Sequence, residues 1–236
     1  MQTSPLWLVV PAAGQGKRMG ADKPKQYLPL EGQPILAHTL ARLHDAFPQA
    51  HLVLCLDPED HWFRPDWVPF SHWQQVPGGI ERMDSVMNAL EAIAANDSDL
   101  VMVHDVARPC ITRADLHALY RAAQSHPSGA LLAMPVADTM KRDQGDQLSH
   151  ATEPRDGLWH ALTPQGFRYA LLRRALTKAQ QQGTVVTDEA SAVEALGEAP
   201  QLVSGRRDNM KVTHPDDLAL ATAIMAAQRS PSNRSF

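Results

Sequence analysis

Short, almost continuous apolar runs alternate with helical patterns along this chain, and that alternation limits the fold more than any other feature. The runs cover residues 6–10, 51–56, 100–103 and 129–136. Such runs are typical of strands that helices cover on both faces. Helical patterns are found at 34–47, 81–95, 112–124, 167–182 and 188–196, and again from 215. The alternation predicts an α/β fold with three layers and a mostly parallel, twisted sheet.

The length of 236 residues favours one domain, which we place at residues 1–228, with a disordered tail at 229–236. Hydrophobic residues make up 44% of the chain, enough for a sizeable core. The formal charge of −4 argues against nucleic-acid binding, which favours a basic face. Neither a signal-peptide pattern nor an apolar stretch of about 18 residues is present, so we expect a cytoplasmic protein that does not bind membranes.

The segment 138–155 is polar almost throughout and contains a turn-like sequence at 143–146. A hairpin with so little apolar surface is marginal by itself in water. It is therefore either a loosely held loop or an arm that a partner stabilises. We expect an arm at 138–160 that contacts a second copy of the chain.

Ligands of parallel α/β sheets bind beyond the carboxyl ends of the strands, which here directs attention to the loops 11–25, 77–85 and 104–110. The first loop is rich in glycine and alanine, so its backbone N–H groups can approach phosphate oxygens closely. A dinucleotide-binding fingerprint would need glycine where Met19 stands. A P-loop would need a Gly-Lys pair that comes later in the loop and is followed by Ser or Thr. Here Gly16 and Lys17 come too early, and Arg18 follows them. Neither motif fits.

Charge sets the same loop apart. Between residues 17 and 25, four bases and one acid give a local charge of +3 in a chain that is negative overall. The bases are Lys17, Arg18, Lys23 and Lys25. Cations held near a reacting phosphate neutralise the charge that grows in a transition state. The loop is therefore predicted to bind a phosphate ester rather than to be a solvated charge run.

The other two loops add candidate ligands. Gly78 and Gly79 precede a helix that carries Arg82 and Ser85, and the Ser85 hydroxyl is suited to reading a base edge. Asp105 ends a buried strand, where one carboxylate together with substrate phosphates can hold Mg²⁺. Arg108 is expected either to bind a phosphate or to pair with Asp105, and His104 to be a packing residue.

A series of sequence blocks resembles a known enzyme family in order from about residue 6 to 225. The blocks are Pro11-Ala-Ala-Gly-x-Gly-x-Arg-Met, Pro24-Lys-Gln-Tyr, Gly79-x-x-Arg-x-Asp-Ser-Val, His104-Asp-x-Ala-Arg-Pro, Asp138-Thr-Met-Lys, Leu162-Thr-Pro-Gln, Thr187-Asp-Glu and Asn209-x-Lys-Val-Thr. Together they strongly resemble the 2-C-methyl-D-erythritol 4-phosphate cytidylyltransferases. Val106 and Ile80 depart from the common pattern, and Val106 raises the question of substrate fit.

The resemblance implies a Rossmann-like nucleotidyltransferase fold with a protruding β-arm. It also implies a reaction of CTP with 2-C-methyl-D-erythritol 4-phosphate in non-mevalonate isoprenoid biosynthesis, with Mg²⁺ required. It assigns catalysis to Arg18, Lys25, Arg155 and Lys211, and the metal to Asp105. Substrate binding falls to Ala12, Ala13, Gly14, Gly16, Lys17, Gly79, Arg82, Ser85, Asp105, Arg108, Thr139 and Thr163.

In the family the arm crosses to the other subunit of a homodimer, so Thr139 and Arg155 are expected to serve the neighbour's site. Two alternatives stay open at this point. One is a ribitol-5-phosphate cytidylyltransferase, and the other is a non-catalytic nucleotide-binding protein of the same fold.

Overall fold

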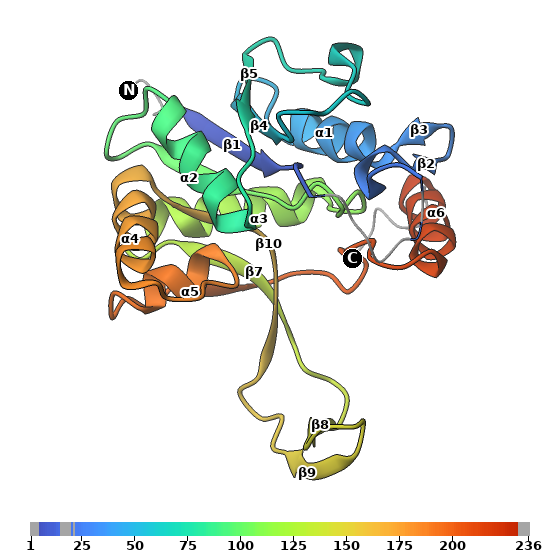
Figure 1. Cartoon of the computed structure of the whole chain (residues 1–236), viewed down its shortest axis with the longest axis vertical. Helices are drawn as coiled ribbons and strands as arrows, with labels where there is room; N and C mark the ends of the chain where they lie inside the picture. The colour runs from blue at the N-terminus through green and yellow to red at the C-terminus, as the bar shows by residue number, and fades with distance from the viewer. Residues whose placement is uncertain (1–4, 15–19, 21, 231–236) are drawn as a thin grey trace.

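A computed structural model describes residues 5–14, 20 and 22–230. Its centre is a seven-stranded sheet with the strand order β11-β7-β10-β6-β1-β4-β5 (Figure 1). The strands are β1 (Leu6–Pro11), β4 (His51–Leu56), β5 (Trp73–Pro77), β6 (Leu100–Val103), β7 (Ala130–Pro135), β10 (Trp159–Arg168) and β11 (Gln201–Ser204). Only β10 runs antiparallel to its neighbours β6 and β7. The predicted three-layer, mostly parallel sheet is therefore confirmed.

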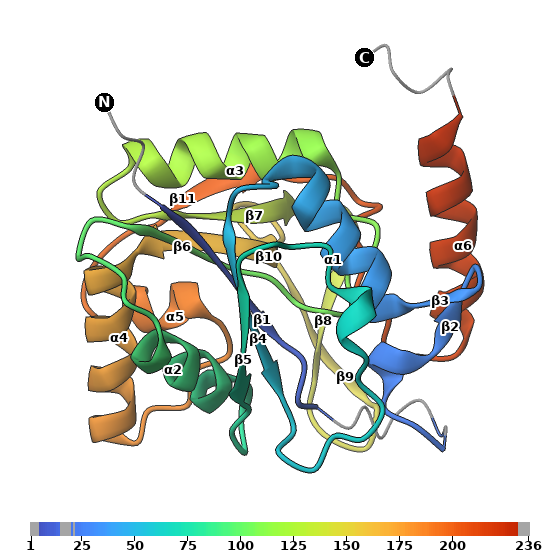
Figure 2. The same cartoon turned by 90° about the horizontal axis from the view of Figure 1, so that it is seen from above.

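Helices cover both faces of this sheet (Figure 2). Helices α1 (Ile35–Ala46) and α3 (Arg113–Ser125) pack on one face. Helices α2 (Arg82–Ala92), α4 (Tyr169–Gln182) and α5 (Glu189–Glu194) pack on the other. Successive β1 side chains alternate between the two layers, because Leu8 and Val10 join the first core and Val9 joins the second.

A third, smaller core holds the last helix, α6 (Asp216–Arg229), against a short hairpin of β2 (Pro29–Leu30) and β3 (Gln33–Pro34). Arg229 ends this helix and forms a 2.6 Å ion pair with Glu31. Helix α6 thus ends one residue beyond the expected domain boundary at 228, and residues 231–236 lie outside the described part. Within the part of the chain that the structure describes, 3-10 turns lie at Lys25–Tyr27 and Pro65–Trp67.

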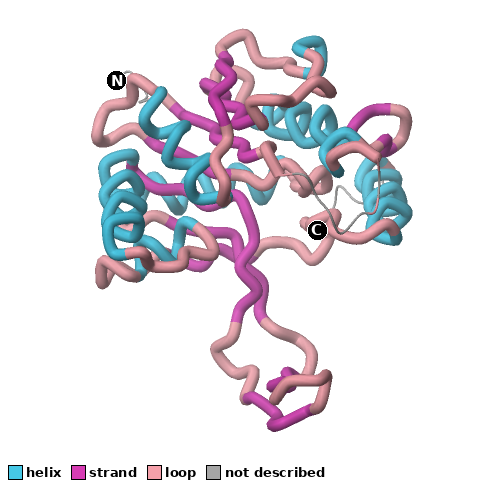
Figure 3. The backbone as a smooth tube through the Cα atoms, viewed as in Figure 1, coloured by secondary structure: helices cyan, strands magenta, loops and turns pink. Residues whose placement is uncertain are grey.

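The polar segment forms the expected hairpin. Strands β8 (Met140–Asp143) and β9 (Ser149–Glu153) pair antiparallel at the tip of an arm that extends away from the sheet (Figure 3). Their side-chain pairs, including Arg142 with Glu153 at 2.6 Å, are exposed. No helix among the described residues is long and apolar enough to cross a membrane.

Candidate active site

A cavity of about 570 Å³ opens at the carboxyl ends of β1 and β6, where the three loops singled out from the sequence meet. It collects residues that are far apart in the chain. The predicted site residues that line it are Ala12, Ala13, Gly14, Lys25, Gly79, Arg82, Ser85, Asp105 and Lys211. Val106 and Ile80, the two departures from the family pattern, also line it.

The described part of the glycine-rich loop is fixed at Ala12. Its N–H donates to the Cys55 carbonyl at 2.8 Å, and its carbonyl accepts from the buried Gln26 side chain at 2.6 Å. Gln26 follows Lys25, whose Nζ donates to the Val212 carbonyl at 3.3 Å. The predicted residues Gly16, Lys17 and Arg18 lie outside the described residues. Sequence reasoning gave Gln26 no role, although it holds the loop that carries the backbone donors.

Close approach of two loops explains the glycine that precedes α2. A Cβ built on Gly78 would lie 2.1 Å from the Ala13 Cβ, so any larger residue would displace the glycine-rich loop. The Gly79 N–H donates to Ser85 Oγ at 3.0 Å, and this hydroxyl lies 3.4 Å from the Glu81 carbonyl. The two residues expected to read the base are thus one hydrogen-bonded unit at the wall of the cavity.

Three cations surround the Asp105 carboxylate. Arg82 Nε lies 3.0 Å from Oδ1, and Lys211 Nζ and Arg108 Nε lie 2.9 and 3.4 Å from Oδ2. Burial alone would raise the pKa of Asp105, but attraction to Arg82, Lys211 and Arg108 outweighs it and holds this pKa well below its usual range. Asp105 is therefore ionised at neutral pH. Of the two roles expected for Arg108, the structure shows the pairing with Asp105.

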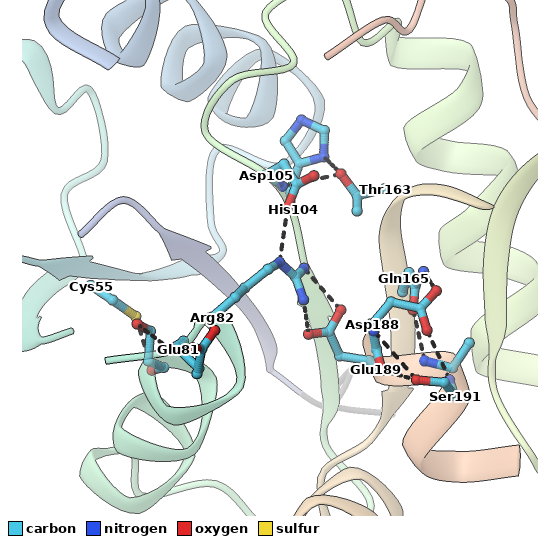
Figure 4. A network of polar contacts seen from close by, with 12 residues as sticks. Cys55, Glu81, Arg82, His104, Asp105, Thr163, Gln165, Asp188, Glu189 and Ser191 are labelled. Carbon is cyan, nitrogen blue, oxygen red and sulfur yellow. Dashed lines mark hydrogen bonds and ion pairs between the residues drawn. The ribbon is translucent and has the colours of Figure 1, made fainter. Parts of the chain in front are cut away.

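A second acid, Glu189, completes the arrangement and was not recognised as a site residue from the sequence. It is 1% exposed and lies at the first position of α5. Arg82 reaches from α2 between Asp105 and Glu189, with contacts of 2.6 and 3.0 Å to the two Glu189 oxygens (Figure 4). Arg82 therefore lines the cavity with its guanidinium already held by two carboxylates.

Thr163 and His104 form a hydrogen-bonded pair that holds the backbone of Asp105. Thr163 Oγ1 accepts from the Asp105 N–H at 3.1 Å and lies 3.0 Å from His104 Nδ1. Burial lowers the pKa of His104 to about 4, so the ring is neutral and carries one N–H. His104 Nε2 lies 3.3 Å from the Arg108 carbonyl, which can only accept, so Nε2 holds the proton and Thr163 donates to Nδ1. The Thr163 hydroxyl thus serves the scaffold rather than lining the cavity.

The remaining two predicted residues, Thr139 and Arg155, lie on the arm and do not line this cavity. The Arg155 guanidinium donates to the carbonyl of Ala137, the residue that precedes the arm in the same chain. The structure of a single chain therefore does not bring these two residues to the other candidates.

Whether Mg²⁺ fits this cavity depends on the carboxylates that face it. Within residues 5–14, 20 and 22–230, no group of three His, Cys, Asp or Glu side chains could hold a metal ion. Three acids, Asp57, Glu81 and Asp105, line the cavity. One carboxylate can hold a hard cation whose other ligands are substrate phosphates and water.

Comparison with known proteins decides the family. The model of the 2-C-methyl-D-erythritol 4-phosphate cytidylyltransferase family matches residues 6–227. The chain belongs to this family.

Two curated 2-C-methyl-D-erythritol 4-phosphate cytidylyltransferases illustrate the sequence similarity. The protein of Chromohalobacter salexigens is 61% identical over 98% of this chain and 93% of its own length. That of Dechloromonas aromatica is 50% identical over 94% of this chain and 98% of its own. The resemblance to this family, inferred from the sequence blocks, is therefore confirmed.

Solved structures agree with this assignment. The enzyme of Francisella tularensis covers 94% of this chain and 100% of its own, with a TM-score of 0.81 at 33% identity. That of Thermus thermophilus covers 94% and 99%, with a TM-score of 0.79 at 35% identity. The overall fold of this chain is thus that of solved cytidylyltransferases.

Proposed function

We propose that this protein joins CTP and 2-C-methyl-D-erythritol 4-phosphate to give 4-diphosphocytidyl-2-C-methyl-D-erythritol and pyrophosphate, a step of non-mevalonate isoprenoid biosynthesis. Family membership supports this reaction, and so does the chemistry of the cavity. The single observation that carries it is the meeting of Lys25, Lys211, Asp105 and the Ala12–Gly14 backbone around one space of about 570 Å³.

The reaction needs positioned charge rather than a general base. Its nucleophile is a phosphate monoester, which is largely dianionic at neutral pH and attacks the α-phosphate of CTP in line. Two anionic groups must be brought together, and cations lower the cost of doing so. We assign Lys25, together with Arg18 from outside the described residues, to the α-phosphate. Lys211 is assigned to the attacking phosphate.

The nucleotide is oriented by the two loops at the cavity wall. The backbone of Ala12–Gly14 faces the triphosphate in this proposal, together with Gly16 and Lys17, while Gly79 and Ser85 contact cytosine. Asp105 would hold Mg²⁺ together with the phosphates of CTP. When bound, the metal supplies positive charge that offsets the charge on the triphosphate. Arg82, Arg108 and Thr163 keep Asp105 at the cavity.

A homodimer completes the site in this proposal. The arm carries Thr139 and Arg155 away from its own cavity, and it exposes Leu148, Leu158 and Trp159. Apolar side chains on a protruding polar hairpin favour contact with another protein surface. In a two-fold dimer each arm can deliver its Thr139 and Arg155 to the other subunit's cavity. Because CTP is a cytoplasmic nucleotide, we place the reaction in the cytoplasm.

Pyrophosphate release by the purified protein tests the reaction. Each of CTP, UTP, ATP and GTP is paired in turn with 2-C-methyl-D-erythritol 4-phosphate and with ribitol 5-phosphate, with and without Mg²⁺. We expect release with CTP and the methylerythritol ester, dependent on the metal. Preference for the ribitol ester would contradict the proposed substrate. CTP binding without turnover of either ester would contradict enzymatic activity.

A further inference from the structure

Arg82 is the only described side chain that contacts both Asp105 and Glu189 by hydrogen bonds, and the two acids use different edges of its guanidinium. Nε–H donates to Asp105 at 3.0 Å, and the two terminal nitrogens donate to the Glu189 oxygens at 2.6 and 3.0 Å. The two hydrogen bonds from the terminal nitrogens to Glu189 fix the plane of the guanidinium. Once that plane is fixed, Nε–H has one direction, and that direction is toward Asp105.

Glu189 is itself held rigidly. The Asp188 side chain accepts from the Ser191 N–H at 2.9 Å and caps the start of α5. Gln165, which is buried on β10, accepts from the Ala190 N–H at 2.8 Å and donates to Asp188 at 2.8 Å. The hydrogen bonds on both sides of Glu189 therefore connect it to the central sheet (Figure 4).

Charge gives Glu189 a second effect. Asp105 alone faces Arg82, Arg108 and Lys211, which is one negative charge against three positive charges. Glu189 provides the second negative charge, on the side of Arg82 that faces away from Asp105. With Glu189 included, the cluster has two negative charges against three positive charges.

We propose that Glu189 is a positioning residue for cytidylyl transfer, which fixes Arg82 so that Arg82 can hold Asp105 at the cavity. Glu189 does not line that cavity, so it acts through Arg82 rather than by touching substrate. The inference rests on the proposed reaction for its kinetic consequence. The contact itself is measurable in the protein without substrate.

The test compares Glu189→Gln with Glu189→Asp and with a matched control, Glu194→Gln. Glu194 ends the same helix and is exposed, so the control removes the same charge from the same element. We expect Glu189→Gln to lower kcat by about 10- to 100-fold, as outer-shell partners do, with a change in KM for CTP of less than about threefold. Glu189→Asp keeps the charge and should retain more of kcat, and Glu194→Gln should match the wild type.

A second readout needs no turnover. The Nε–H resonance of Arg82, assigned by its loss in Arg82→Lys, should exchange slowly with solvent in the wild type and in Glu194→Gln. In Glu189→Gln it should exchange rapidly. Because this measurement uses the ligand-free protein, it stays informative even if the wild type fails to make product, an outcome that would refute the proposed function alone.

Two results would overturn the proposal. One is a wild-type kcat in Glu189→Gln, and the other is a loss of kcat with the Arg82 resonance unchanged, which would assign Glu189 a merely structural role. If Glu189→Gln does not fold, Glu189→Asp takes its place. It must then show both faster exchange at Arg82 and a reduced kcat, and wild-type values for either would count against the proposal.

Discussion

Lys211 Nζ lies 2.9 Å from Asp105 Oδ2, which joins the loop after β6 to the segment that leads into α6. Both segments are also joined by their backbones, because the Val212 N–H donates to the Ala107 carbonyl at 2.8 Å. The segment is held again at its far end, where Asp217 accepts from the backbone N–H of Thr213 at 2.7 Å. The position of this cation thus depends on the C-terminal helix.

Replacing Asp105 by Asn should destabilise the fold. The change leaves Arg108, which is about as buried as Asp105, without its anionic partner. Breaking a buried ion pair in this way costs about 3 kcal/mol of unfolding free energy. Urea unfolding measures it. Asp66→Asn is the control, because the Arg64–Asp66 pair is exposed and such pairs contribute little. Equal stability of the two variants would show that the cluster around Asp105 is not strongly coupled.

Replacing Lys25 by Ala should reduce kcat by about 100-fold or more while changing CTP affinity much less, since a cation at the reacting phosphate acts mainly in the transition state. Steady-state kinetics and equilibrium CTP binding separate the two effects. Arg173→Ala, which removes an exposed cation from α4, should change neither. Near-normal turnover in Lys25→Ala would remove this residue from the mechanism, and Arg18→Ala tests the other predicted cation in the same way.

Mixing two inactive variants tests the arm. If each site combines one body with the partner's arm, a heterodimer of Lys25→Ala and Arg155→Ala chains has one intact site. Statistical exchange of subunits then predicts about a quarter of the wild-type activity. A mixture of Thr139→Ala and Arg155→Ala should stay inactive, because both changes are on arms. Fully active protein that sediments as a monomer would contradict the shared site.

Gly78→Ala should impair nucleotide binding by displacing Ala13, whose Cβ would lie 2.1 Å from the new methyl group. Overpacking of this kind costs about 1–3 kcal/mol, so KM for CTP should rise by about tenfold. The double variant Gly78→Ala, Ala13→Gly removes the clashing atom and should recover most of the loss. If the double variant is no better than the single one, the displacement of Ala13 is not the cause.

Both cysteines should resist alkylation in the folded protein. Burial raises the pKa of Cys55 to about 12 and that of Cys110 to about 11. Because the thiolate is the reactive form, raising these values lowers its population at pH 8, and burial blocks access. Iodoacetamide labelling followed by mass spectrometry should find both thiols unmodified in native protein and labelled in urea. Rapid native labelling would indicate local opening near β4 or α6.

The sequence predicts the inner parallel strands well, because a strand covered on both faces is apolar at nearly every position. It does not reveal β10, which contains Thr163, Pro164, Gln165 and Gly166, since these residues are typical of loops. In the antiparallel strand β10 these residues contact segments that are distant in the sequence, and no local pattern encodes such contacts. The edge strands β5 and β11 were missed for a related reason, since their polar residues face solvent at the sheet margins.

The candidate site could be located from the sequence because three loops follow strands whose carboxyl ends meet. The role of each residue within the site is harder to predict from the sequence. The Asp105 loop was found, but its support by Thr163 and His104 depends on distances between separate strands. Glu189 belongs to one of the blocks that carry the resemblance, Thr187-Asp-Glu, but its local sequence indicates only a helix start. Its role follows from its burial beside Arg82.

Strand β10 leads from the arm at Trp159 into the sheet, with a shift in its register to β7 between Ala161 and Gln165, and it supplies both Thr163 and Gln165. The first fixes the backbone of Asp105 and the second fixes the start of α5. The strand that leads out to the arm therefore also holds both acids of the ionic cluster in place, Asp105 through Thr163 and the start of α5, with Glu189, through Gln165.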